Sequence, residues 1–241
     1  MMKMHHFKCL LIAVTLLVAA GVALAGDGSG GIDLPDSYLP NGDCLIGNLN
    51  PPVIPSYPDV FTGNEAYAYH VKPSDQCGCP EEHFTLETIT MLVDFEANQI
   101  PQTLAVTPSL LSAVFNAGSG CFEPGPPLCI GPDIVVNVND PGIQTITVPL
   151  LGCGPFPLGN DYFLSLAYEG GAPANLVIDN DPQACTEFIN NGNGWVDMSG
   201  MKSKGDKTGG GKLIVYGDIV CAAPPVGVES RAWGAIKSLF H

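Results

Sequence analysis

The chain has 241 residues and a formal net charge of −15, with 24 acidic residues against nine basic ones. Between Lys72 and Lys202 it contains no lysine or arginine. Because binding to a phosphate backbone needs clustered basic side chains, this charge pattern excludes nucleic acid as a partner and disfavours anionic membrane surfaces.

The first 25 residues predict a secretory signal peptide. Lys3 and Lys8 form the basic start, residues 10–20 form an apolar core, and the Ala-Leu-Ala sequence that ends at Ala25 is a cleavage motif. The apolar run is short for a membrane span, so we expect cleavage and no stable membrane span in the mature chain. The mature protein is therefore predicted to be secreted by a bacterium, or held at its cell surface.

Eight cysteines remain once the signal peptide is removed. An even number in an exported chain predicts four disulfides. Cys77 and Cys79 are too close in sequence to join each other without strain. The eight are Cys44, Cys77, Cys79, Cys121, Cys129, Cys153, Cys185 and Cys221.

The sequence leaves the pairing of these cysteines open. Cys121 and Cys129 flank the turn-rich stretch FEPGPPL, so we expect them to form one pair. Cys185 with Cys221 is a second, weaker expectation.

After an irregular arm at residues 26–57, the chain alternates short β-like runs with clusters of turn residues. Residues 102–115 are ambiguous, because a helix or a second strand fits the part after Pro108. The NDPG sequence at 139–142 is typical of a hairpin turn between two runs. In 161–169, alternation places Tyr162, Leu164, Leu166 and Tyr168 on one core face. The predicted strands are 65–72, 83–96, 102–115, 132–138, 143–150, 161–169, 174–179 and 211–221.

This pattern predicts an all-β protein with one domain at residues 58–221. Short strands at regular intervals, separated by Gly- and Pro-rich turns, favour a single antiparallel β-sandwich of the jelly-roll type, stapled by disulfides. No stretch inside the domain has a long helical period.

Two polar loops between 179 and 197 carry the residue types that bind calcium. Calcium takes carboxylate, amide and backbone oxygens from loops, and calcium is the one cofactor that the sequence suggests. The same residues also form tight turns, which is the preferred interpretation. The candidate ligands are Asp179, Asn180, Asp181, Asn190, Asn193 and Asp197.

Trp195, inside the second of these loops, has polar neighbours in sequence. An exposed indole would stack on a glycan, which makes a calcium-dependent carbohydrate-binding module an alternative function. A large aromatic residue is more often buried, so Trp195 as a plug at the end of the sandwich is the preferred interpretation.

Residues 222–241 follow the last predicted strand as a Pro-containing linker and a short tail. With Ser230 as the N-cap, an α-helix would present an apolar stripe that needs a surface to lie against. That surface is either the protein's own sandwich or an export or anchoring machinery. The predicted stripe consists of Ala232, Trp233, Ile236, Leu239 and Phe240, and Lys237 is on the opposite face.

The order of several motifs resembles a group of uncharacterised secreted bacterial β-sandwich proteins. The motifs are PGPPLC, IQTITVPL, DYFLSLAY, NLVIDNDPQAC, NGWVDM and GKLIVYGDIVC. The terminal ESRAWGAIKSLF is similar to a W-G-x-I-K-x-L-F/Y tail in that group, and this resemblance implies a sorting or anchoring role for the tail. Tails of the group end in arginine, whereas this chain ends in His241.

The sequence contains no motif for catalysis. G-x-S-x-G, H-E-x-x-H and the phosphate-binding P-loop are all absent. The predicted function is therefore a non-catalytic protein of adhesion, extracellular matrix or surface structure, with a glycan or a surface protein as partner. A secreted hydrolase that uses two of the many carboxylates is the remaining alternative.

Overall fold

The computed structural model describes residues 44–50, 53–171, 173–179, 181–200 and 211–223, without the side chains of 53–61 and 151. All of these residues belong to one compact unit, Gly31–His241. The predicted signal peptide at 1–25 and the predicted tail helix lie outside the described residues, as does Asn180.

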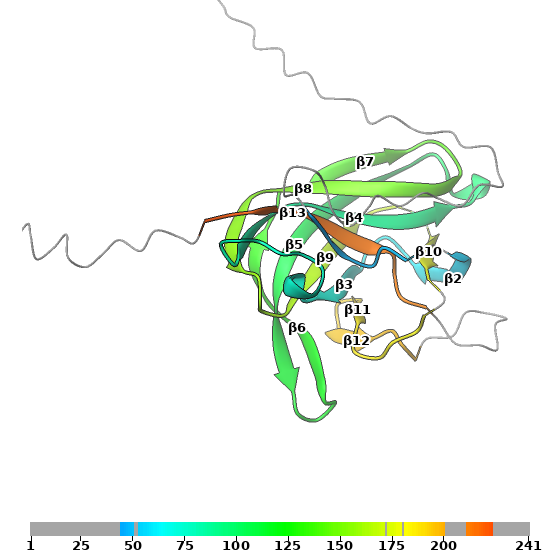
Figure 1. The fold of residues 1–241 in the computed structure, drawn as a ribbon. Helices are drawn as coiled ribbons and strands as arrows, with labels where there is room; N and C mark the ends of the chain where they lie inside the picture. Colours follow the sequence, from blue (N-terminus) through cyan, green and yellow to red (C-terminus); the bar gives the residue numbers. More distant parts are fainter. Residues whose placement is uncertain (1–43, 51–52, 172, 180, 201–210, 224–241) are drawn as a thin grey trace, which may run out of the picture. The chain divides into compact units, whose positions relative to one another are not determined.

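Two antiparallel sheets form a sandwich-like all-β fold (Figure 1), which confirms the predicted fold class at that level. In the first sheet the order is β1-β13-β4-β10-β2, and β8 pairs with the other edge of β4. Its strands are β1 (Cys44–Gly47), β2 (Val53–Phe61), β4 (His83–Phe95), β8 (Gly142–Pro157), β10 (Ala174–Ile178) and β13 (Val215–Cys221).

The second sheet has the order β12-β11-β3-β9-β5-β6, and β7 also pairs with β5. Its strands are β3 (Ala66–Val71), β5 (Gln102–Asn116), β6 (Cys121–Ile130), β7 (Ile134–Val138), β9 (Tyr162–Glu169), β11 (Glu187–Asn190) and β12 (Trp195–Asp197). The only helices among the described residues are two short 3₁₀ turns, η1 (Pro73–Asp75) and η2 (Ala97–Gln99). The described part of the chain has no helix that is long and apolar enough to cross a membrane.

The core lies between the two sheets and combines side chains from both. Phe84 and Met91 of β4 belong to the same buried cluster as Tyr67 of β3 and Tyr168 of β9. The rings of Tyr67 and Tyr168 meet edge to face, with centroids 6.1 Å apart. Burial of this many large side chains is the main stabilising contribution to such a fold.

The predicted core face of β9 is confirmed. Tyr162, Leu164, Leu166 and Tyr168 are buried in the shared core. Phe163, on the opposite face, belongs to a separate apolar cluster on the outer side of the second sheet. The outer side of this sheet is therefore partly apolar as well.

The region 102–115 is one long strand, so its helical alternative is wrong. β5 pairs with β7 through Val106 and with β6 from Ser109 onward, and Pro108 lies where the partner changes. Gly131, between β6 and β7, donates its N–H to the carbonyl oxygen of Pro108 at 2.8 Å. Proline has no backbone N–H to donate. It is tolerated at this position because β5 changes partners here, and neither β6 nor β7 needs a donor from it.

The NDPG sequence does not form the predicted hairpin. β7 pairs with β5 in the second sheet, whereas β8 pairs with β4 in the first. The turn thus connects the two sheets, because β7 and β8 each pair with a strand of a different sheet. The described part of the predicted irregular arm (26–57) also differs from expectation, since Cys44–Gly47 forms the buried strand β1 beside β13 and β2 already begins at Val53.

Four disulfides are present, as the even number of cysteines predicts. They join Cys44 to Cys77, Cys79 to Cys221, Cys121 to Cys185, and Cys129 to Cys153.

The two pairs proposed from sequence, Cys121–Cys129 and Cys185–Cys221, are both wrong. FEPGPPL is part of the strand β6, not a turn, so roughly 25 Å of extended chain separates Cys121 from Cys129. Cys221 ends β13 in the first sheet, whereas Cys185 precedes β11 in the second.

Candidate functional site

The predicted calcium ligand Asp179 follows β10 and is deeply buried, with 2% of its surface exposed. Its Oδ2 accepts hydrogen bonds from the side-chain amides of Asn48 (3.1 Å) and Asn50 (2.7 Å). Its Oδ1 accepts the backbone N–H groups of Asp181 (2.9 Å) and Lys212 (2.7 Å). The carboxylate therefore joins three segments of chain through four donors.

Lys212 adds a positive charge to this cluster. Its Nζ lies 2.7 Å from Oδ2 of Asp181 and 3.8 Å from Oδ2 of Asp179. A Cβ atom at Gly211 would overlap the carbonyl oxygen of Asp179, so the backbone of the last segment approaches closely only because residue 211 is glycine. We call Asn48, Asn50, Asp179, Asp181 and Lys212 the Asp179 cluster.

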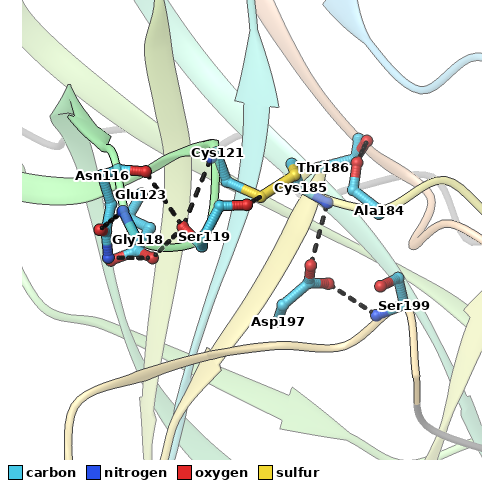
Figure 2. The surroundings of a disulfide bond; sticks show 10 residues. All are labelled: Asn116, Gly118, Ser119, Cys121, Glu123, Ala184, Cys185, Thr186, Asp197 and Ser199. Carbon is cyan, nitrogen blue, oxygen red and sulfur yellow. Dashed lines mark hydrogen bonds between the residues drawn. A yellow bond between two sulfur atoms is a disulfide. The ribbon is translucent and has the colours of Figure 1, made fainter.

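The other predicted ligands have partners of their own. Asp197 accepts the backbone N–H groups of Cys185 (3.0 Å) and Ser199 (2.8 Å), as Figure 2 shows. Asn193 is exposed and donates to Oδ1 of Asn191 at 3.3 Å, while Oδ1 of Asn190 accepts the N–H of Gly192 at 2.9 Å. The chain's own donors thus explain the shape of these loops, and calcium binding stays a prediction.

Glu187, at the start of β11, is a buried carboxyl group that the sequence analysis did not single out. It is 1% exposed, and its Oε2 accepts the backbone N–H of Leu213 at 2.6 Å. Burial is the main cause that raises the pKa of Glu187 to about 8. The Leu213 hydrogen bond and the charge of Lys212 oppose this rise, and the charges of Asp179 and Asp197 add to it. This group is therefore largely protonated at neutral pH.

Trp195 of β12 is half-buried on the outer side of the second sheet. It packs against the apolar cluster that includes Phe163 and Phe188. The side chain thus contributes packing, in keeping with the preferred interpretation, although it covers a sheet face and not the end of the sandwich.

A cavity of about 350 Å³ opens elsewhere on the second sheet, at the base of the β5–β6 hairpin. It forms where β5 and β6 meet the loop between β8 and β9, so residues far apart in sequence line it. Phe122 and Leu128 form apolar walls, and Asp161 lies on the polar side. Among the described residues, the lining consists of Ser112, Ala113, Phe122, Leu128, Gly159, Asn160, Asp161 and Tyr162.

His70 of β3 is not a lining residue itself, but it contacts two of the residues that are. Its Nε2 lies 3.1 Å from Oδ1 of Asp161, and the two side chains are 24% and 25% exposed. Its ring stacks on Phe122, with centroids 5.8 Å apart and planes 16° apart, and also contacts Phe163. Burial lowers the pKa of His70 despite the opposing charge of Asp161, so at neutral pH the imidazole is neutral and Nε2–H donates to the carboxylate.

The β5–β6 hairpin extends beyond its neighbour in the sheet. β9 pairs with β5 only as far as Ser112, so β5 from Ala113 to Asn116 pairs with β6 alone. Figure 1 shows this hairpin running past the other strands. The free part of the hairpin therefore has little support from the rest of the sheet.

The tip of the hairpin is instead held by hydrogen bonds and by the disulfide Cys121–Cys185 (Figure 2). Asn116 and Ser119 both donate to Oε1 of Glu123, at 2.8 and 2.9 Å. Cys121 and Cys185 also lie close to Asp197, but disulfide sulfurs are not the thiolates that bind metal ions. The Cys121–Cys185 disulfide therefore acts as a covalent brace, and Asp197 is hydrogen-bonded beside it.

The braced hairpin carries exposed apolar side chains. Phe115 is 58% exposed and meets Phe122 edge to face, with centroids 5.6 Å apart. Leu128 is 47% exposed and lines the cavity. We call Ala113, Phe115, Phe122 and Leu128 the hairpin face.

Sequence reasoning missed the hairpin face, His70 and Asp161. These residues come from β3, β5, β6 and the β8–β9 loop, so no local spacing connects them. The one available signal was the pair of phenylalanines on either side of the glycine-rich turn at 117–120, which the structure places opposite each other.

Comparison of the chain with protein-family models, with curated proteins and with solved structures finds no significant match.

Proposed function

We propose that this protein is a secreted or cell-surface, non-catalytic β-sandwich protein of jelly-roll type that binds an extracellular partner through its hairpin face. The observation that carries the proposal is the exposure of Phe115 and Leu128 beside a cavity with a polar side. Large apolar side chains that gather on a surface generally mark an interaction site.

The way in which the hairpin is held supports a binding role. Four disulfides indicate folding in an oxidising, extracellular type of environment. The disulfide Cys121–Cys185 and the hydrogen bonds to Glu123 order the hairpin before any partner arrives. A preordered surface loses less conformational entropy on binding, so a small contact area suffices for useful affinity.

The polar groups of the described residues favour binding over catalysis. Asp179 and Asp197 bond to donors within the chain, and His70 bonds to Asp161. Within the part of the chain that the structure describes, no serine or cysteine is hydrogen-bonded to His70, as an activated nucleophile requires. Adhesion or a structural role outside the cell is the function that fits these contacts.

A sedimentation assay with insoluble polymers tests the proposal. The native protein is mixed with cellulose, chitin or collagen-coated beads, and the fraction that sediments is measured. We expect the protein to bind at least one of these materials, and Phe115→Ser to lower the affinity about tenfold or more through the loss of apolar contact area.

Val135→Ser is the matched control for this assay. Val135 is 65% exposed on β7, roughly 30 Å along the sheet from Phe115. If neither variant binds less than the native protein, or if both lose affinity equally, the hairpin face is not the binding surface.

A further inference from the structure

The cavity beside the hairpin face has the chemistry of a carbohydrate site. Ligand pockets usually have volumes of about 300–1,000 Å³, and this cavity, at about 350 Å³, lies at the lower end of that range. Its size suits one sugar ring better than an extended peptide. The strands β5 and β6 contribute mainly aromatic and aliphatic side chains and one hydroxyl group, and the β8–β9 loop contributes a carboxylate and an amide. A pyranose ring has the same division, with apolar C–H faces and polar hydroxyl edges.

The apolar side is held rigid before a ligand binds. The Phe122 ring lies against His70 and meets Phe115 at its edge, so its position is set by both neighbours. Leu128 and Ala113 extend this side along the hairpin. An aromatic ring in a fixed position gives contact area at low entropic cost, which is how proteins bind the C–H face of a sugar.

The polar side is rich in acceptors. Asp161 uses Oδ1 to accept the His70 N–H, and a carboxylate has acceptor capacity for further donors. The Ser112 hydroxyl donates to the carbonyl oxygen of Pro126 at 3.0 Å, so its oxygen can accept in turn. Sugar hydroxyls are hydrogen-bond donors, and a bond from a hydroxyl to a carboxylate is charge-assisted.

The charge of the described lining residues disfavours anionic ligands at this site. Among the residues that the structure describes, the lining contains Asp161 and no lysine, arginine or histidine. A sulfated or carboxylated sugar would meet the Asp161 carboxylate without a compensating cation, which disfavours binding. The cavity therefore selects neutral sugars.

A second hollow of about 520 Å³, lined by residues of β3, β9 and β11 and of the loops next to them, lacks a large exposed apolar side chain among the described residues, because Tyr168 is buried in the core. It is lined by Glu65, but the Glu65 carboxylate already accepts hydrogen bonds from Tyr67 (2.8 Å) and from the backbone N–H of Asn64 (2.9 Å). Thr62 donates to it as well, through its hydroxyl and its N–H, at 2.5 Å each. Glu65 thus closes its own loop and has little capacity left for a ligand.

We infer that the cavity lined by Phe122, Asp161 and Ser112 is a calcium-independent subsite for one neutral pyranose unit of an extracellular glycan. The inference rests on the proposed binding function and identifies the ligand class at the same surface. Phe122 supports the C–H face, Asp161 and Ser112 accept hydroxyl protons, and His70 is a positioning residue that orients Asp161. Phe115 and Leu128, at the rim, contact the next sugar units of a chain.

A glycan array tests this site with the full native protein. The array carries neutral oligosaccharides, with sialylated and sulfated ones as comparison, and is probed with and without a calcium chelator. We expect binding to neutral oligosaccharides only, unchanged by the chelator. Absence of neutral binding, or binding that requires calcium, would overturn the inference.

Isothermal titration with the best oligosaccharide from the array then tests the residues. Asp161→Asn keeps the shape of the side chain, and Ser112→Ala changes little of the fold. We expect each to weaken affinity about fivefold or more, with melting temperatures within a few degrees of the native value. Asp140→Asn, at an exposed acidic residue of the β7–β8 turn, is the matched control and should leave affinity unchanged.

The outcomes separate this inference from the broader proposal. If Phe115→Ser abolishes binding to the polymers while Asp161→Asn and Ser112→Ala bind like the native protein, the hairpin face is a binding surface and the sugar subsite is wrong. If oligosaccharide affinity responds to Asp161→Asn but polymer binding does not respond to Phe115→Ser, the cavity binds sugar and the proposed surface role fails.

Discussion

Asp179 and Asp161 are both aspartates in loops next to strands, but the two regions use them differently. In the Asp179 cluster, four donors surround a carboxylate that is 2% exposed. Beside the hairpin face, Asp161 has His70 as its neighbour, is 25% exposed and lines a cavity. In a dense run of Asn and Asp residues, the side chains can have their hydrogen bonds satisfied within their own loops, whereas an isolated aspartate remains accessible to a ligand.

The largest expected effect comes from removing the carboxylate of the Asp179 cluster. Asp179→Ala leaves the side-chain amide of Asn50 and the backbone N–H groups of Asp181 and Lys212 without their acceptor, and it removes one of the two carboxylates near the Lys212 ammonium. We expect a loss of about 3–5 kcal/mol in the free energy of unfolding, measured by urea denaturation. Asp161→Ala should lower the free energy of unfolding by less than about 1 kcal/mol, because water can replace the carboxylate as the acceptor for His70. Equal losses in the two variants would contradict the distinction between the regions.

Glu187 predicts how the stability of the buried region depends on pH. Because its pKa is raised to about 8 in the folded protein, from an ordinary value of 4.5, folding favours the protonated form. Its stabilising contribution is complete below pH 4.5 and is lost as the pH rises to 8, by up to about 1.4 kcal/mol per pH unit.

Urea midpoints of the native protein and Glu187→Gln between pH 5 and 8 test this dependence. The amide cannot ionise and keeps an acceptor for the Leu213 N–H. We therefore expect the variant to have the flatter profile and to be the more stable of the two at pH 8. Parallel profiles would show that Glu187 is ionised throughout this range.

Removal of the Cys121–Cys185 disulfide is expected to lower the free energy of unfolding less than Asp179→Ala does. Replacing both Cys121 and Cys185 by serine removes a link between residues 64 positions apart, and such links contribute about 2–4 kcal/mol. The loss of order should be greatest in the free part of the hairpin, residues 113–122, because this part pairs with no strand outside the hairpin. Amide hydrogen exchange should therefore speed up more in these residues than in β4. Uniform acceleration across both sheets would mean that the disulfide supports the whole fold and not the hairpin.

Part of the fold could be predicted because its cause is local. The alternation in 161–169 predicts which side chains of β9 enter the core, since successive residues of a strand point to opposite faces. The even number of cysteines predicts four disulfides for the same kind of reason, as the oxidising compartment acts on each cysteine regardless of position. The predicted interpretation of Trp195 as a packing residue rested on the average burial of its residue type.

Other features could not be predicted, because they depend on which strand lies beside which. NDPG has the composition of a hairpin turn, but the two strands that it joins belong to different sheets. FEPGPPL has the composition of a loop, but β5 provides a long edge on which it forms β6. Turn residues specify a local change of direction, whereas pairing is decided by the apolar faces that meet.

By itself, the sequence determined the secondary structure class, the number of disulfides and the excess of negative charge, because these follow from composition and from the two-residue period of strands. Only the tertiary structure decided the disulfide partners, the use of Asp179 as a buried link and the meeting of His70, Phe122 and Asp161 around a cavity. The physical reason is that a contact between residues from different strands depends on the register and order of those strands, which arise from packing of the whole core and not from any short segment.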